Sequence, residues 1–444
     1  MPGHQQLRAL RVLPRRKASA AGAPGGSFCP GGNHRPILQR VGRGDRIVIF
    51  TTHKAYEKNW LDGGHGDSVL EGGAPVEGLK TRIAAMGLNP GIKVQKVPIP
   101  DGSDEAEIWE IFRIVYDTIN KGDEVVFDIT HALRSIPMLA IVILSYARVL
   151  KEITIAGIYY GAFEVLGSLS EVKRMPIEDR LAPILDLTPI AGLLEWTSAV
   201  DRFVSSGDPA KVSALTTAGV RPILKQTKGA DQAAQTLRGI ADNLEHFCAV
   251  MSTCRGPKIT DAARCLNSML ADLERADILP PFAPLFGVIK NELRSFEGDP
   301  LSDGFQAVTW CLNHGLIQQG FTILNELIVG WVLRNTIGET KDVNLRSLPS
   351  WAAAFLKEGP KARPGQCDEP ATENMDLVRP IITFFEEHPD ILDPINQIRD
   401  YRNDMNHAGW RENPIKEKKF SKKLKDLLQK VKPILLRQSG SQSG

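Results

Sequence analysis

The chain has 444 residues, enough for two or three domains, and its hydrophobic fraction of 42% is that of an ordinary globular protein. The formal net charge of +2 gives no overall sign of a nucleic-acid partner. The six cysteines include no CxxC pair, and the longest apolar run is far shorter than a bilayer span. A disulfide framework, a structural zinc site and a membrane protein are therefore not indicated, and we expect free thiols in a reducing cytoplasm.

Residues 1–44 are rich in Gly, Pro, Ala and Arg, and they carry eight Lys or Arg and no acidic residue. Such a segment buries little apolar area, so we expect it to be poorly ordered, apart from a degenerate first strand at residues 7–13. The composition superficially resembles an organelle transit peptide, because it is Arg-rich and acid-poor. A poorly ordered or wrongly assigned start is the interpretation we prefer.

Residues 45–189 alternate between short apolar runs of strand type and amphipathic or apolar helical runs. The predicted strands are "DRIVIFTT", "IKVQKVPIP", "DEVVFDIT" and "ITIAGIYYG". The predicted helices are "GLKTRIAAMG", "DGSDEAEIWEIFRIVYDTINKG" and "SIPMLAIVILSYARVLK". Because the strands are almost continuously apolar, the pattern predicts a parallel sheet with helices on both faces.

Polar side chains follow two of the predicted strands, at the edge where parallel sheets bind ligands. They are Thr51, Thr52, Asp128, Thr130, His131, Arg134 and Ser135. Hydroxyls, a helix N-terminus and a guanidinium together suit a nucleotide or another phosphorylated ligand. An alternative is local and structural: Thr130 and Ser135 cap the next helix, and Asp128 accepts from a nearby backbone amide. No GxGxxG or GxxxxGK[ST] motif is present, so an ordinary dinucleotide or ATP site is not indicated.

Residues 190–444 show the helical period and predict an all-helical domain of six or more helices. Its last stretch is basic: residues 411–437 carry ten basic and three acidic groups. These lysines could attract RNA, but a solvated helix face is the simpler interpretation.

The segment "RDYRNDMNHAGW" near the end places Arg402, Asn403 and His407 close together. On a helix, Asn403 and His407 share a face, and the long side chain of Arg402 can reach round to it. An imidazole for proton transfer, an amide and a fixed cation are what RNA cleavage without a metal requires. Taken alone, an Arg-x4-His spacing is a weak signal that often occurs by chance, and a solvated helix face is then the better explanation.

Three motifs in the first half resemble the CARF domain of CRISPR-associated proteins, over roughly residues 45–190. They are "VPIPDGSDEAEIWEIF", "VVFDITHALRSIPMLA" and "GIYYGAFE". The resemblance is to the subgroup with an Asp-x-Thr-His-Gly signature, in which this chain has Ala132 in place of the glycine. It implies a Rossmann-like sensor that dimerises and binds a cyclic oligoadenylate across its two-fold axis. The polar strand-end residues named above would then face this activator.

The Arg-x4-His motif, with Asn403 and the preceding "LNHGLIQQGFTILNELIVGWVL", resembles the ribonuclease signature of HEPN domains. The resemblance implies a metal-independent endoribonuclease of type III CRISPR antiviral defence, allosterically activated by a cyclic oligoadenylate, with the tetra-adenylate favoured. Arg402, Asn403 and His407 would be its catalytic residues, single-stranded RNA its substrate, and 2′-hydroxyl attack its chemistry. The rival hypothesis is a non-catalytic cyclic-nucleotide sensor whose helical domain binds a partner.

The Arg-x4-His motif supplies only one imidazole per chain, which bears on the oligomeric state. Acid–base catalysis needs two proton-transfer groups or a relay, so we expect a homodimer, or a higher even oligomer, that brings two copies of Arg402 and His407 together. Whether the sensor domain also cleaves its activator is left open by the sequence.

Overall fold

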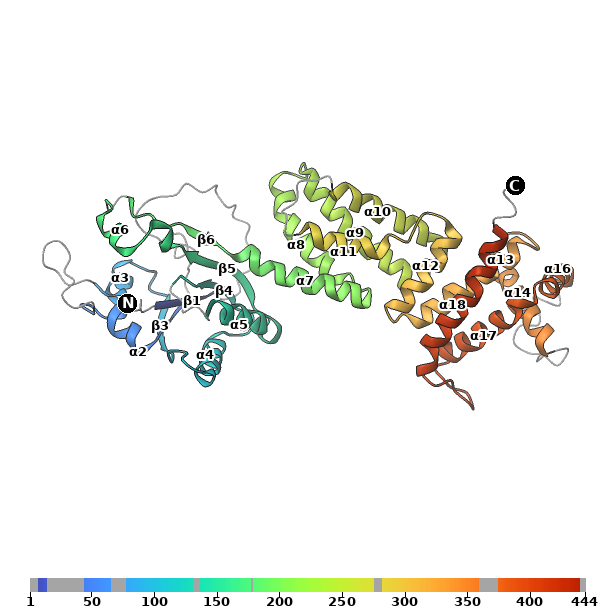
Figure 1. Cartoon of the computed structure of the whole chain (residues 1–444), viewed down its shortest axis with the longest axis horizontal. Helices are drawn as coiled ribbons and strands as arrows, with labels where there is room; N and C mark the ends of the chain where they lie inside the picture. The colour runs from blue at the N-terminus through green and yellow to red at the C-terminus, as the bar shows by residue number, and fades with distance from the viewer. Residues whose placement is uncertain are drawn as a thin grey trace. The chain divides into compact units, whose positions relative to one another are not determined.

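The structure is a computed structural model that describes residues 7–13, 44–64, 77–130, 136–176, 179–274, 282–358 and 374–439. The chain forms two compact units, Met1–Leu194 and Glu195–Gly444 (Figure 1). The first unit contains a six-stranded sheet with helices packed on it, and the second is built from helices only.

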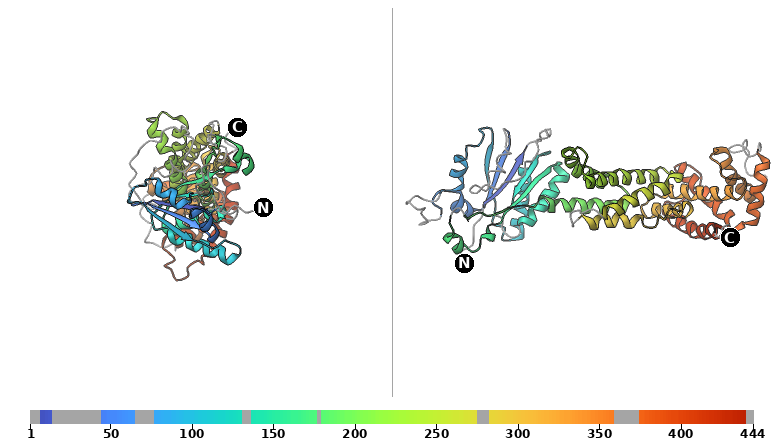
Figure 2. Two further views of the ribbon diagram at one scale, coloured as in Figure 1. Left: turned by 90° about the vertical axis from the view of Figure 1, so that its left-hand side faces the viewer. Right: turned by 90° about the horizontal axis from the view of Figure 1, so that it is seen from above.

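The sheet of the N-terminal unit has the strand order β3-β2-β1-β4-β5-β6, and Figure 2 shows its strands side by side. The strands are β1 (Leu7–Leu13), β2 (Arg46–Thr51), β3 (Lys93–Pro98), β4 (Glu124–Asp128), β5 (Thr154–Gly161) and β6 (Ile184–Asp186). Residues 7–13, where the sequence predicts a first strand, thus form the centre of the sheet.

The sheet is mixed, so the prediction of an all-parallel sheet was wrong. β2 pairs in parallel with β3, and β4 pairs in parallel with β5. The central β1 runs antiparallel to both β2 and β4, and the edge strand β6 runs antiparallel to β5. An apolar run has the same hydrophobic pattern in either direction, which is why the sequence pattern could not predict the direction of β1 and β6.

Helices of the N-terminal unit cover the sheet and connect its strands. They are α2 (His53–Ala55), a π-helical turn η1 (Tyr56–Trp60), α3 (Leu79–Ala85), α4 (Glu105–Thr118), α5 (Ile136–Lys151), η2 (Phe163–Leu166), α6 (Leu169–Arg174) and the start of α7 (Thr188–Ser206). Alternate strand residues such as Phe50 and Phe127 are buried against Ile111 of α4 and Leu144 of α5. One face of the sheet is therefore closed by α4 and α5, and the strand ends are left at its edge.

The helical unit has one continuous hydrophobic core, which extends from α7 to the last helix. Its helices are α8 (Ala210–Gln226), α9 (Gln232–Ser252), η4 (Gly256–Lys258), α10 (Ile259–Glu274), α11 (Ala283–Leu293), α12 (Pro300–Asn313), α13 (Ile317–Arg334), α14 (Val343–Glu358), α16 (Met375–Glu387), α17 (Pro389–Asn406) and α18 (Lys418–Ser439). α13 is buried along most of its length, so it forms the central helix against which α12, α17 and α18 pack.

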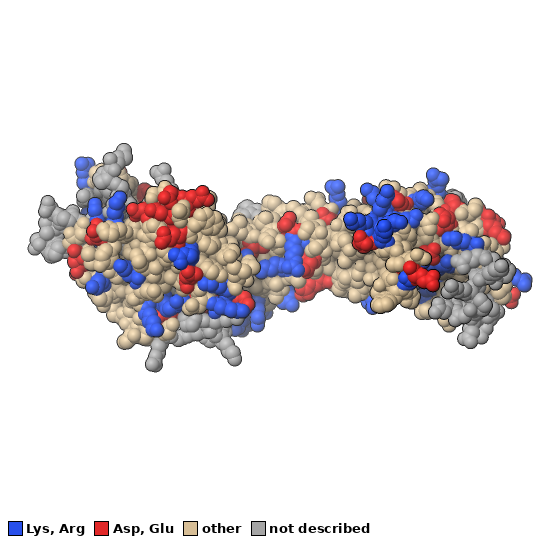
Figure 3. Space-filling model, turned by 90° about the horizontal axis from the view of Figure 1, so that it is seen from below, with Lys and Arg blue, Asp and Glu red and all other residues tan. Residues whose placement is uncertain are grey.

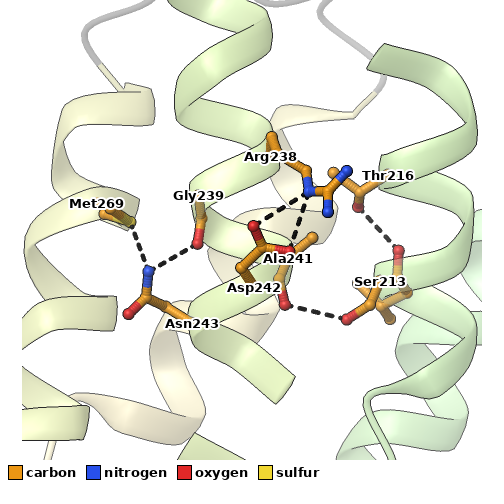
Figure 4. Close-up of polar contacts among 9 residues, drawn as sticks. Ser213, Thr216, Arg238, Gly239, Ala241, Asp242, Asn243 and Met269 are labelled. Carbon is orange, nitrogen blue, oxygen red and sulfur yellow. Dashed lines mark hydrogen bonds and ion pairs between the residues drawn. The ribbon is translucent and has the colours of Figure 1, made fainter. Parts of the chain in front are cut away.

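Small residues and short polar contacts hold α8, α9 and α10 together (Figure 4). Ser213 of α8 donates its hydroxyl to the backbone oxygen of Ala241 in α9 at 3.2 Å. Asn243 of α9 donates from Nδ2 to the Gly239 oxygen at 2.9 Å and to Sδ of Met269 in α10 at 3.2 Å. A Cβ on Gly239 would come within 3.0 Å of Met269, so the absent side chain permits this close approach.

Among the described residues, no helix is both long and apolar enough to cross a membrane. No group of three His, Cys, Asp or Glu side chains within the described ranges could hold a metal ion. The described cysteines Cys248, Cys254, Cys265 and Cys311 are all free thiols.

Candidate functional site

The polar residues of the N-terminal unit lie at one edge of the sheet. Thr51 ends β2 and Asp128 ends β4, and both strands run antiparallel to β1, which lies between them. β1 pairs Leu7 with Thr51 and Ala9 with Asp128. Two strand spacings and a two-residue stagger along β1 therefore place the two strand ends roughly 12 Å apart. The structure therefore brings these two predicted ligand residues to the same edge.

The two threonines at the end of β2 have different surroundings. The Thr52 hydroxyl accepts from the backbone N–H of Ala55 at 3.3 Å and so caps α2. Thr51 is only 1% exposed, and its Oγ1 has no hydrogen-bond partner among the residues that the structure describes. A buried hydroxyl without a partner is costly, which marks Thr51 as a group that a ligand or another segment can satisfy.

A short hydrogen-bonded chain links the ends of β4 and β5. The Asp128 carboxylate accepts from the backbone N–H of Thr130 at 2.8 Å, which is the local contact that the structural alternative expects of it. The Thr130 hydroxyl accepts from the backbone N–H of Gly161 at 2.7 Å. Since the oxygen of Thr130 serves as acceptor here, its own O–H remains able to donate to a bound anion. His131, Arg134 and Ser135 lie outside the described residues.

The second group of predicted residues lies at the end of α17, which is fixed to the core by an aromatic contact. Tyr401 stacks on Phe321 of α13 with ring centroids 5.5 Å apart and meets Phe420 of α18 edge-on at 5.5 Å. Burial raises the pKa of the Tyr401 hydroxyl. These rings join three helices directly beside Arg402, so the helix end that carries the motif is held in place.

Arg402, Asn403 and His407 occupy the last turn and the C-cap of α17. Arg402 is half-buried, while Asn403 and His407 are exposed. The backbone N–H of His407 donates to the Asn403 oxygen at 2.9 Å, as expected for residues on one helix face. Arg402 is roughly 140° round the helix from His407, and within the described part of the chain no hydrogen bond joins the three side chains. One chain therefore presents the three groups on one helix end without bringing them into contact.

The helix stops at this point because the backbone turns into the left-handed region. Ala408 has φ 53° and Gly409 has φ 72°, and the Gly409 N–H donates to the Asp404 oxygen at 2.9 Å. The Asp404 side chain, 4% exposed, accepts from the Ile415 N–H at 3.1 Å and faces the Arg411 guanidinium at 3.5 Å. A buried carboxylate thus fixes the loop that follows His407.

Sequence reasoning missed several residues that shape the two sites. They are Gly161, Gln318, Asp404 and Trp410. Gly161 and Asp404 lie inside the motifs that were recognised, yet their contacts depend on which segments meet in space. Trp410 carried a usable signal, because an indole in a polar turn has no apolar periodicity to explain it.

Together these features define a two-unit protein, an α/β unit with a polar strand edge followed by an all-helical unit. No protein-family model matches the chain. A segment of 117 residues, 26% of the chain, is 36% identical to a CRISPR-associated protein of Methanocaldococcus jannaschii and covers 17% of that relative. Over this segment the chain is related to CRISPR-associated proteins, which confirms the resemblance that the motifs indicated.

Csm6 of Enterococcus italicus, bound to cyclic hexa-2′-fluoro-hexa-dAMP, is among the solved structures that align with the chain. The alignment covers 88% of this chain and 86% of that structure, with a sequence identity of 9% and a TM-score of 0.37.

Proposed function

We propose that the protein is an endoribonuclease of type III CRISPR antiviral defence, which cleaves single-stranded RNA without a metal ion once a cyclic oligoadenylate has bound. The observation that carries the proposal is the exposed end of α17, where a guanidinium, an amide and an imidazole stand within six residues: Arg402, Asn403 and His407. The kinship of part of the chain with a CRISPR-associated protein supports the defence context.

The N-terminal unit acts in this proposal as a Rossmann-like, CARF-type sensor. β2, β3, β4 and β5 run in the same direction, while β1 and β6 run against them. The carboxyl ends of the four parallel-running strands therefore lie at one end of the sheet, which is where ligands bind in nucleotide-binding α/β sheets. Thr51, Thr52, Asp128 and Thr130 lie at that edge. We assign activator binding to these four and to His131, Arg134 and Ser135, whose cationic and hydroxyl groups suit the activator phosphates.

The reaction follows from the chemistry of the three residues. A neutral imidazole of His407 takes the proton of the RNA 2′-hydroxyl, and the freed oxygen attacks the adjacent phosphorus. The bond from phosphorus to the 5′-oxygen breaks, and a second, protonated imidazole gives that oxygen a proton. The guanidinium of Arg402 stabilises the charge that develops at phosphorus, and Asn403 orients a reacting group. The products are a 2′,3′-cyclic phosphate and a 5′-hydroxyl.

The second imidazole comes from a second copy of the chain. Because Arg402 and His407 point in directions roughly 140° apart on α17, one chain cannot easily aim both at the same phosphate. A two-fold interface would pair Arg402 of one copy with His407 of the other. A two-fold axis also matches a ring with an even number of equal units, such as cyclic tetra- or hexa-adenylate; of these we favour the tetra-adenylate as activator.

The test is an RNA cleavage assay in the presence of a chelator, with cyclic tri-, tetra- and hexa-adenylate added in turn. We expect one ring size to start cleavage, and His407→Ala to slow it by about 10²–10⁴-fold. Near-wild-type cleavage by His407→Ala would refute the assignment. Arg134→Ala with Thr130→Ala should remove the response to activator and leave the fold intact. A protein that binds the ring and never cleaves RNA is instead a sensor whose helical unit binds a partner.

A further inference from the structure

Trp410 is exposed to an unusual degree, three residues after His407. Its side chain is 90% exposed, the highest value among the large hydrophobic residues that the structure describes. Tryptophan is largely buried in most folded proteins, because its indole is the largest apolar side chain. An exposed indole close to the proposed catalytic residues is therefore a candidate binding surface.

The indole is carried by a turn with fixed backbone geometry. The Trp410 N–H donates to the His407 oxygen at 3.0 Å, and the Arg411 N–H donates to the Gly409 oxygen at 2.8 Å. The buried carboxylate of Asp404 ties down Arg411 and Ile415 on the far side of the turn. Trp410 is therefore exposed on a hydrogen-bonded turn, and these hydrogen bonds fix the position of its backbone relative to His407.

A strongly basic helix begins next to this turn. α18 carries seven lysines and one acidic residue, Asp426, and the lysines are Lys418, Lys419, Lys422, Lys423, Lys425, Lys430 and Lys432. None of them forms an ion pair with another described residue. The contact of Phe420 with Tyr401 brings the first turn of α18 alongside the helix that carries Arg402. Figure 3 shows that Lys and Arg side chains gather on the helical unit. Such an excess of one charge favours a polyanion.

A second basic segment, the turn after α9, is connected to the end of α17 through the first turn of α13. Gln319 donates to the backbone oxygen of Ser252 at 3.4 Å, and its neighbour Gln318 donates to Asn406 at 3.1 Å. Ser252 ends α9 and is followed by Arg255 and Lys258, both exposed and without an acidic partner among the described residues. The first turn of α13 therefore links the helix end that precedes these cations to the helix end that carries the motif.

We propose that Trp410 is a base-stacking platform for the RNA substrate, and that the first turns of α18 hold the phosphates of the same strand. The inference rests on the proposed function and deepens it, because it names how the substrate reaches His407. An aromatic plane among unpaired cations is the combination that binds single strands, whose unstacked bases offer a free face. Paired strands keep their bases stacked, and a membrane surface would require more apolar side chains than one indole.

The first experiment measures binding of a 2′-O-methyl single-stranded RNA, which cannot be cleaved through its 2′-oxygen, with activator present. Trp410→Leu removes the π face, and we expect affinity to fall roughly 5- to 150-fold. Trp410→Phe keeps an aromatic face and should bind within a few-fold of wild type. The matched control is Trp109→Leu, because Trp109 is also an exposed tryptophan, at 62%, and lies in the N-terminal unit. It should leave affinity unchanged.

The second experiment removes charge and measures the salt dependence of the same binding. Lys418, Lys419 and Lys422 are changed together to Gln, which should lower the slope of log K against log salt by about 2. The matched control changes Arg221, Lys225 and Lys228 to Gln. Arg221 and Lys225 are exposed on the last turns of α8, and Lys228 is exposed in the turn between α8 and α9. This turn precedes the first residue of α9, and Ser252 lies roughly 30 Å further along that helix. The control slope should equal that of wild type.

The outcomes separate this inference from the proposed function. Three results would each contradict the proposed RNA-binding surface. They are equal RNA affinity of Trp410→Leu and wild type, an unchanged salt slope in the lysine variant, and binding of duplex DNA as tight as that of single-stranded RNA. A shift of the Trp410→Leu protein to a smaller mass in sedimentation would show that a second copy covers the indole, and would also overturn it. If RNA binds through these residues but is never cleaved, only the proposed nuclease function is contradicted. If activated cleavage is unchanged by the Trp410 and lysine substitutions, only the proposed RNA-binding surface is contradicted.

Discussion

Gln318, on the first turn of α13, donates a hydrogen bond from Nε2 to Oδ1 of Asn406 at 3.1 Å, and Asn406 directly precedes His407. The next residue, Gln319, reaches the other way, to the backbone oxygen of Ser252 at the end of α9. Because α13 is buried along most of its length, this turn is a fixed point between two helix ends. Gln318 is therefore placed to position His407 without touching the substrate.

Gln318→Ala should slow RNA cleavage through the position of His407. A hydrogen bond of this kind is worth about 0.5–1.5 kcal/mol net, so we expect kcat to fall about 2- to 12-fold, with KM for RNA unchanged. The measurement is RNA cleavage at saturating activator across a pH series, where a displaced imidazole changes the profile as well as the rate. Gln319→Ala is the matched control and should keep the wild-type profile. An equal loss in both variants would mean that α13 itself was disturbed.

Asp404→Ala should destabilise the helical unit and loosen the loop that follows His407. The substitution leaves the Ile415 N–H without its acceptor and Arg411 without its carboxylate, next to a buried position. We expect the free energy of unfolding to fall by about 1–3 kcal/mol, measured by urea denaturation. Glu412→Ala, at an exposed residue of the same loop, should change it by less than about 0.5 kcal/mol. Similar values for the two variants would argue against Asp404 as the anchor of the loop.

Thr130→Val tests the link between β4 and β5 at the sensor edge. Valine keeps the shape but removes the acceptor of the Gly161 N–H and the donor that we assign to the activator. We expect activator affinity, measured by calorimetry, to fall by about tenfold, the value of one hydrogen bond to a charged phosphate. Thr130→Ser restores the hydroxyl and should recover most of the affinity. Equal affinity in all three proteins would show that the Thr130 hydroxyl does not meet the ligand.

The sequence was most informative where local pattern decides the structure. The helix that ends at His407 could be predicted, because residues 389–406 have a Pro start and a His-Ala-Gly end. The break between α12 and α13 could be predicted from Gly315, whose φ is 72°. The buried face of α18 could also be predicted, because Leu424, Leu427 and Val431 recur at helical spacing; all three are buried.

What could not be predicted depends on contacts between distant segments. The antiparallel direction of β1 is set by its pairing with β2 and β4, and an apolar strand pattern carries no direction. The roles of Gln318 and Asp404 depend on partners 88 and 11 residues away, respectively. From composition, the lysines of α18 are indistinguishable from an ordinary solvated helix face. Their relation to the motif becomes visible only in the structure, where Phe420 of α18 contacts Tyr401 of α17 and Trp410 is exposed in the loop between the two helices.

The free cysteines of the helical unit should differ sharply in reactivity. Burial raises the pKa of the Cys248 and Cys311 thiols to about 12, and burial also raises the pKa of half-buried Cys254. The thiolate is the reactive form, so at pH 8 iodoacetamide should label the exposed Cys265 first and Cys254 more slowly. Cys248 and Cys311 should be labelled only after denaturation, as peptide mass spectrometry can establish. Rapid labelling of Cys311 in the folded protein would contradict its burial.

The same pKa values predict how stability depends on alkaline pH. In the unfolded chain these thiols lose their protons near pH 9, while in the folded protein the pKa of each is about 12. A raised folded pKa means that the stabilising contribution is complete below pH 9 and is lost as the pH rises toward 12. Cys311→Ala removes one of the two groups, so the difference in unfolding free energy between wild type and variant should shrink across this range. A constant difference for Cys311→Ala would mean that the Cys311 thiol ionises in the folded protein as it does in the unfolded chain.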